Sequence, residues 1–81
     1  MEKTVLVTQT VKVKIDETKF NESFMSEFRK YLYNFKTIDD HIKHLAQLHA
    51  RGIYDNGDFI EGYGDEMGIE FKVEDTEIEI V

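Results

Sequence analysis

The sequence predicts an α+β fold, in which two helices pack on one face of a small antiparallel sheet of two or three strands. Three observations support this prediction. Apolar and polar residues alternate near both ends of the chain, as in half-buried strands. Two segments between them repeat apolar residues at helical spacing. Turn-forming residues separate the segments in the order β-α-α-β, with a further β if the last strand is split.

The first predicted strand covers residues 3–15 and places β-branched side chains on one face, with threonines and lysines on the other. At about 3.3 Å per residue it would span roughly 40 Å, which is long for 81 residues. We therefore expect a bend or bulge near Gln9. The apolar face of this strand consists of Val5, Val7, Val11, Val13 and Ile15.

The first predicted helix covers residues 22–33, with Asn21 as its N-cap. The second covers residues 38–51: Thr37 caps it, Asp39 and Asp40 suit the positive end of the helix dipole, and Gly52 ends it. The apolar stripe of the first helix is expected in the core and consists of Phe24, Phe28, Tyr31, Leu32 and Phe35. The stripe of the second consists of Ile38, Ile42, Leu45, Ala46 and Leu48 or His49.

Glycine and turn residues follow the second helix, and residues 69–81 again alternate as a strand. Apolar residues occupy odd positions up to Val73 and even positions from Ile78. Because a one-residue slip moves every side chain to the other face, this change of phase predicts a bulge or turn around residues 74–76. We expect the last strand to pair antiparallel with the first.

Length and composition favour one domain, residues 1–81, with a small core and no disulfide or cysteine-bound metal. No signal peptide or long apolar run is visible, so a cytoplasmic location is expected. The net charge of −7 argues against direct binding to nucleic acid or to an anionic membrane. It favours a basic protein surface as partner.

The negative charge is concentrated in residues 52–81, where ten acidic residues and one lysine give −9. Residues 1–51 hold nine basic and seven acidic residues, which gives +2. A row of carboxylates can imitate the phosphates of a nucleic acid, and part-exposed aromatic side chains among them would anchor an interface. The predicted partner-binding residues are Asp55, Asp58, Glu61, Asp65, Glu66, Glu70, Glu74, Glu77 and Glu79.

No motif for catalysis or a cofactor is present, so we expect a protein that is not an enzyme and holds no cofactor or metal. The serines lie far from any histidine in the sequence, and the glycines do not open a helix after a strand. Two metal sites are alternatives. His41 and His44, with Asp40, have the spacing of ligands on one helix face. A loose calcium site on the set Asp55, Asp58 and Glu61 is the other.

Six runs that cover nearly the whole chain resemble small acidic proteins of phages and mobile elements, of the anti-CRISPR kind. The runs are VTQTVKVKIDETKF, SFMSEFRKY, TIDDHIKHLAQLHARGIYD, DFIEGYG, EMGIEF and EDTEIEIV. The resemblance implies a type I CRISPR-Cas inhibitor that binds the surveillance complex and blocks DNA recognition. It transfers no individual functional residue.

The expected function is therefore stoichiometric inhibition by a monomer or small homo-oligomer, whose acidic surface covers a basic nucleic-acid-binding surface of a protein partner. Two alternatives come from other classes. One is a phage structural or accessory protein that self-associates through an exposed edge strand. The other is a small metal-binding module.

Overall fold

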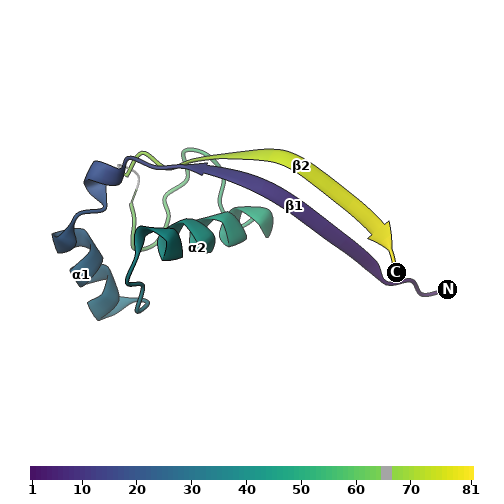
Figure 1. Ribbon diagram of the computed structural model, residues 1–81, viewed down its shortest axis with the longest axis horizontal. Helices are drawn as coiled ribbons and strands as arrows, with labels where there is room; N and C mark the ends of the chain where they lie inside the picture. Colours follow the sequence, from purple (N-terminus) through teal and green to yellow (C-terminus); the bar gives the residue numbers. More distant parts are fainter. Residues whose placement is uncertain (65–66) are drawn as a thin grey trace.

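The computed structural model describes residues 1–64 and 67–81. Strand β1 (Val5–Lys14) leads through a short 3₁₀ turn, η1 (Glu17–Lys19), into helix α1 (Glu22–Tyr31). Helix α2 (Ile38–Ala50), a long loop and strand β2 (Glu70–Ile80) complete the chain (Figure 1). The predicted α+β class and the order β-α-α-β are confirmed.

Strands β1 and β2 pair antiparallel along their whole length, and in the described part of the chain they form a two-stranded sheet. The register shifts between Thr10 and Val11: Thr10 lies opposite Asp75 and Val11 opposite Val73. Glu74 is therefore the extra residue of a β-bulge. The bulge predicted around residues 74–76 is confirmed, and β2 continues through it as one strand.

The helix ends follow from local chemistry that the sequence displays. The side chain of Asn21 accepts a hydrogen bond from the Phe24 N–H and begins α1. Thr37 and Asp40 form a reciprocal capping box at the start of α2. Gly52 has φ +73°, a conformation that costs glycine little, and it follows the last turn of α2. These three predicted end points are confirmed.

The core lies in a body that contains both helices, the loop and the adjoining part of the sheet. Both helices lie on the same side of the sheet, with α2 against β1 (Figure 1). Aromatic side chains dominate the core, and the fully buried His41 is its polar member. Its buried apolar residues are Phe20, Met25, Phe28, Leu45, Ile60, Tyr63 and Phe71.

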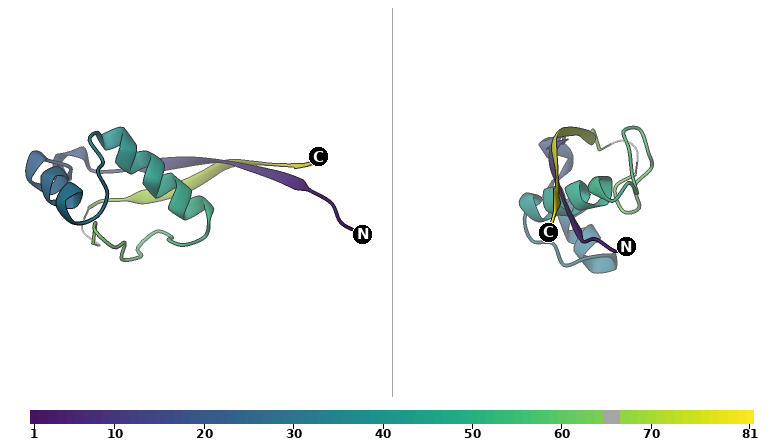
Figure 2. Two further views of the ribbon diagram at one scale, coloured as in Figure 1. Left: turned by 90° about the horizontal axis from the view of Figure 1, so that it is seen from below. Right: turned by 90° about the vertical axis from the view of Figure 1, so that its right-hand side faces the viewer.

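The sheet extends far beyond the helices as a twisted, two-stranded projection, so that the molecule measures 51 × 22 × 19 Å (Figure 2). We call the part beyond the bulge, residues 5–10 paired with residues 75–80, the distal arm. Both termini lie at its end (Figure 1).

Two expectations about the core were wrong. Val5 and Val7 are exposed, because the helices cover the sheet only next to the body and leave the distal arm bare. Tyr31 and Leu32, expected in the stripe of the first helix, are also exposed, because α1 ends at Tyr31 and the expected stripe does not continue as a helix. None of the helices in the described residues is long and apolar enough to cross a membrane.

Candidate partner-binding surface

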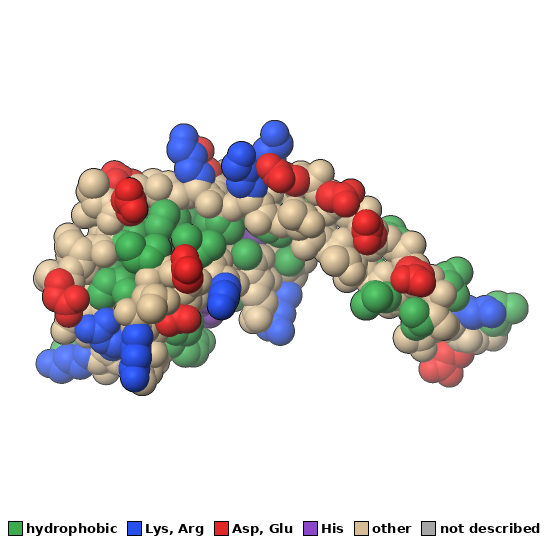
Figure 3. All heavy atoms as spheres, in the orientation of Figure 1, with side chains coloured by type: hydrophobic (Ala, Val, Ile, Leu, Met, Phe, Trp, Pro, Cys, Tyr) green, Lys and Arg blue, Asp and Glu red, His purple; other side chains and the backbone are tan. Residues whose placement is uncertain are grey.

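The strand register assigns the side chains of the distal arm to two opposite faces. Directly opposed residues of an antiparallel pair share a face, and alternate residues along each strand share it too. Asp75, Glu77 and Glu79 lie opposite Thr10, Thr8 and Leu6, respectively. We call this set the acidic face. In Figure 3, carboxylates follow one side of the projecting arm.

No basic residue lies near the acidic face along either strand. Residues 4–11 and 73–81 contain neither lysine nor arginine. Asp75, Glu77 and Glu79 are all exposed, so their charges are in water and directed away from the body. Because the arm is thin and projects, it concentrates these negative charges at one end of the molecule.

The opposite side of the distal arm is apolar. Val5 pairs with Ile80 and Val7 with Ile78, while Gln9 and Thr76 follow towards the bulge. We call Val5, Val7, Ile78 and Ile80 the apolar face. Their exposed fractions are 46%, 58%, 71% and 67%, respectively. Apolar side chains gather near the free end of the arm in Figure 3.

The carboxylates on the body side of the bulge are near lysines. Lys12 lies directly opposite Lys72, and Lys14 opposite Glu70. The Lys12 Nζ is 3.7 Å from a Glu74 carboxylate oxygen, and the Lys14 Nζ is 4.0 Å from Glu70. Both pairs are exposed and stabilise the fold little, but they offset the charges of Glu70 and Glu74. These two predicted residues therefore contribute less to the negative field than their number suggests.

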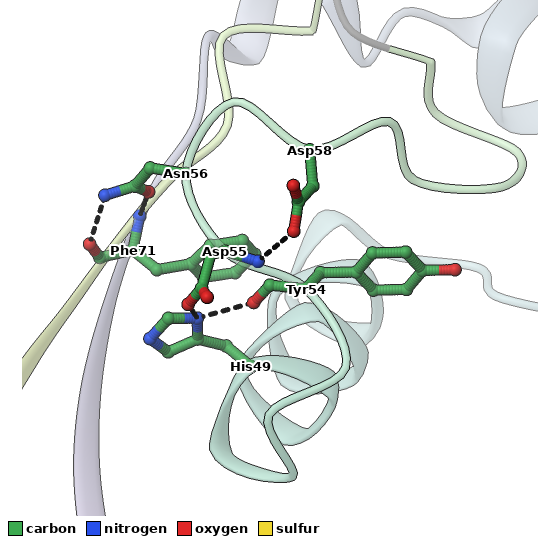
Figure 4. A network of polar contacts seen from close by, with 6 residues as sticks. All are labelled: His49, Tyr54, Asp55, Asn56, Asp58 and Phe71. Carbon is green, nitrogen blue, oxygen red and sulfur yellow. Dashed lines mark hydrogen bonds and ion pairs between the residues drawn. The ribbon is translucent and has the colours of Figure 1, made fainter.

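Asp55 and Asp58 help to shape the loop that packs on the end of α2 (Figure 4). The Asp58 carboxylate accepts a hydrogen bond of 2.7 Å from the Asp55 N–H. The His49 Nδ1 donates to the Tyr54 carbonyl at 2.7 Å and lies 3.6 Å from Asp55 Oδ1. The His49 ring stacks on Phe71, with centroids 4.6 Å apart. These two acids have a local structural role.

The nine predicted residues therefore do not form one surface. The seven in the described ranges are exposed, while Asp65 and Glu66 lie outside the described residues. Of the seven described residues, only Glu77 and Glu79 share the acidic face, and Asp75, which was not among the predicted residues, completes it. The predicted bulge was the signal that would have identified Asp75, because beyond a bulge the odd-numbered positions 75, 77 and 79 share one side.

The histidine set of the second helix is divided between core and surface. His41 is fully buried and its Nδ1 lies 2.8 Å from the Tyr63 hydroxyl, whereas His44 is only partly buried and contacts the Tyr33 ring. Within residues 1–64 and 67–81, no three His, Asp or Glu side chains come together as metal ligands. The two alternative metal sites are therefore not formed in the described residues: the first is Asp40, His41 and His44, and the second is Asp55, Asp58 and Glu61.

Comparisons with protein-family models, with curated proteins and with solved structures found no match.

Proposed function

We propose that the protein is a non-enzymatic, stoichiometric inhibitor that inserts its distal arm into a basic nucleic-acid-binding surface of a partner protein. The supporting observation is the acidic face: three exposed carboxylates on one side of a projecting, two-stranded arm that has no basic residue along either strand. The body holds the arm in place, and the arm makes the contact.

The spacing of the carboxylates sets the strength expected of this contact. Alternate residues of a strand lie about 7 Å apart, so the acidic face carries one charge per ~7 Å along β2. A single nucleic-acid strand carries one charge per ~3.4 Å of helix axis. The arm thus has roughly half the charge density of the ligand that it would exclude, and tight binding requires further contacts. Leu6 lies opposite Glu79 on the acidic face with 52% of its surface exposed, and it would supply an apolar contact.

The resemblance to anti-CRISPR proteins suggests which partner to test first. A type I CRISPR-Cas surveillance complex holds nucleic acid in basic channels, and the acidic face would occupy such a channel and block DNA recognition. In this proposal the protein acts in the cytoplasm of the host cell, without a cofactor and without binding nucleic acid itself.

A co-elution experiment tests the proposal. The protein is mixed with each of several type I surveillance complexes, with and without target DNA, over a series of salt concentrations. We expect co-elution that target DNA prevents and that weakens as salt rises, because exposed charges are screened over a Debye length of about 10 Å at 0.1 M salt. Binding that coexists with DNA, or that does not depend on salt, would contradict the proposal, as would the absence of binding to every complex.

A further inference from the structure

We infer that the apolar face of the distal arm binds the same face of a second copy, so that two arms stack into a two-fold symmetric dimer. The inference concerns the side of the arm that the proposed function does not use. It depends on the exposure of Val5, Val7, Ile78 and Ile80, on the distribution of charge over the arm and on the area available.

None of the described residues covers the apolar face of the distal arm. A two-stranded ribbon is at best marginally stable in water unless a further strand or a helix covers its apolar face. Here Val5–Ile80 and Val7–Ile78 form two adjacent apolar cross-strand pairs, and the described residues of the chain leave all four side chains substantially exposed. A surface that covers these pairs would stabilise the arm.

The distribution of charge favours a second copy as the cover. The apolar face contains no charged residue, and its neighbours Gln9 and Thr76 are neutral, so neither a basic nor an acidic partner is selected. When two such faces stack at the usual ~10 Å between sheets, the two acidic faces point away from each other on the outside. Their carboxylates then lie roughly 20 Å apart, beyond the Debye length of ~8 Å at physiological salt.

Pairing through the outer edge of β2 is less favourable than stacking of the faces. The outer edge of β2 carries the bulge and alternating acids, features that prevent two edges from pairing. An added β2 from another copy would place like charges side by side, which is destabilising. Stacking of the apolar faces avoids this, because it leaves Asp75, Glu77 and Glu79 in water.

The exposed area of the apolar face predicts a weak dimer. The four residues expose on the order of 400 Å² per copy, about the size of the largest apolar patch of a typical monomer, which is often functional. Two copies would bury roughly 800 Å² in total, below the ~1,200 Å² typical of stable complexes. An isologous interface of this size associates only at high concentration. In such a dimer both acidic faces remain accessible on opposite sides.

Sedimentation velocity tests the inference, with two variants that add the same charge to opposite faces of one arm. Ile78→Lys places a charge on the apolar face, and Thr8→Lys places one opposite Glu77 on the acidic face. Between low-micromolar and millimolar protein we expect the wild type and Thr8→Lys to shift from monomer to dimer, and Ile78→Lys to remain monomeric. A wild type that stays monomeric throughout, or two variants that dimerise equally, would overturn the inference.

A cross-linking measurement gives the same test without adding a charge. Because the chain has no cysteine, Val7→Cys and Thr8→Cys each introduce one thiol, on the apolar and on the acidic face. Under mild oxidation at high concentration we expect Val7→Cys to form a disulfide-linked dimer much faster than Thr8→Cys. Equal rates, or faster linkage of Thr8→Cys, would overturn the inference. The outcome is independent of any test with a surveillance complex.

Discussion

His41 is the buried polar residue of the core, and its protonation state affects the stability of the fold. Its side chain is fully buried, and its Nδ1 lies 2.8 Å from the Tyr63 hydroxyl. Burial raises the pKa of Tyr63, so this hydroxyl stays neutral and donates, and the hydrogen of a neutral imidazole then resides on Nε2. Nε2 has no hydrogen-bond partner among the residues that the structure describes, and the rings of Phe28 and Phe35 lie 4.6 and 5.0 Å from the imidazole, centroid to centroid.

This environment predicts that the protein loses stability in mild acid. Burial lowers the pKa of His41, and the nearby His44 lowers it further, against the opposing effect of Asp40. Below about pH 6.5 the unfolded chain protonates this histidine before the folded chain does. Above that pH, His41 therefore does not reduce the free energy of unfolding. As the pH decreases below it, the free energy of unfolding decreases by at most ~1.4 kcal/mol per pH unit for one proton.

Urea denaturation on both sides of pH 6.5 checks this prediction. His41→Leu should remove most of the dependence. Burial also lowers the pKa of His44, but this side chain is only partly buried, so His44→Gln should remove a smaller part of the dependence. Asp16 and Asp40 also have lowered pKa values, from hydrogen bonds to their carboxylates, but they act in a separate, more acidic range. If His41→Leu lost stability below pH 6.5 as steeply as the wild type does, another group would be responsible.

Asn56 connects the long loop to β2 through a pair of hydrogen bonds. The Phe71 N–H donates to Asn56 Oδ1 at 2.6 Å, and Asn56 Nδ2 donates to the Phe71 carbonyl at 3.0 Å (Figure 4). The Asn56 side chain thus satisfies both backbone groups of Phe71, as a neighbouring strand would.

We expect Asn56→Ala to lower the free energy of unfolding by about 1–3 kcal/mol, because it leaves two part-buried backbone groups without partners. The exposed Asn34 gives a matched control, and Asn34→Ala should change the stability little. Denaturant unfolding measures both variants. Equal stabilities for the two would show that water replaces the Asn56 amide without cost.

At the scale of the elements, the bulge at Glu74 decides which side chains share a face. On the body side, Val11 and Val73 lie opposite each other, and Val11 packs against the core. On the arm side, Thr10 lies opposite Asp75. Removal of Glu74 would join these two pairs into a regular ladder without moving any side chain to the other face. The bulge therefore adds local twist and bend where the arm leaves the body.

Deletion of Glu74 is thus predicted to keep the fold and to straighten the arm. Cross-strand nuclear Overhauser effects between Thr10 and Asp75 and between Val11 and Val73 should persist, and the maximum dimension from X-ray scattering should increase. Substitution by Glu74→Ala is the control, since it removes the Lys12 ion pair but retains the extra residue. A loss of these contacts in the deletion variant alone would show that the register needs the bulge.

Local sequence patterns were sufficient to predict most elements, because the residues at each helix end form its cap. Asn21, Thr37 and Gly52 have cap functions that need no tertiary information. The change of phase between Val73 and Ile78 likewise predicted the bulge. Burial was predicted less well. Alternation makes Val5 and Val13 equivalent, although only Val13 lies where α2 and the core cover the sheet. His41 was also missed as a core residue, because its partner Tyr63 is 22 positions away.

The candidate surface shows the same limit. Sequence reasoning grouped nine acids by their position in the chain, while the structure divides those that it describes among the loop, the lysine-rich part of the sheet and the distal arm. Counting charges could not reveal that Lys12 and Lys14 lie beside Glu74 and Glu70, because that proximity is created by pairing between the two ends of the chain.

At the scale of the whole molecule, the proposed function gives the body and the arm separate roles. The aromatic core fixes the body, and the sheet carries the acidic face away from it, to the far end of a molecule 51 Å long. If the arm makes the contact, charge at its end should matter far more than the same charge on the body.

The most direct measurement compares two double variants in displacing target DNA from a type I surveillance complex. The first, Glu77→Lys with Glu79→Lys, reverses two charges on the arm. The second, Glu17→Lys with Glu27→Lys, makes the same change of charge at exposed positions of the body. We expect the arm variant to lose roughly tenfold or more in apparent affinity, which corresponds to about 1.4 kcal/mol or more, and the body variant to remain near the wild type. Equal losses in the two variants would contradict the claim that the acidic face of the arm is the binding surface.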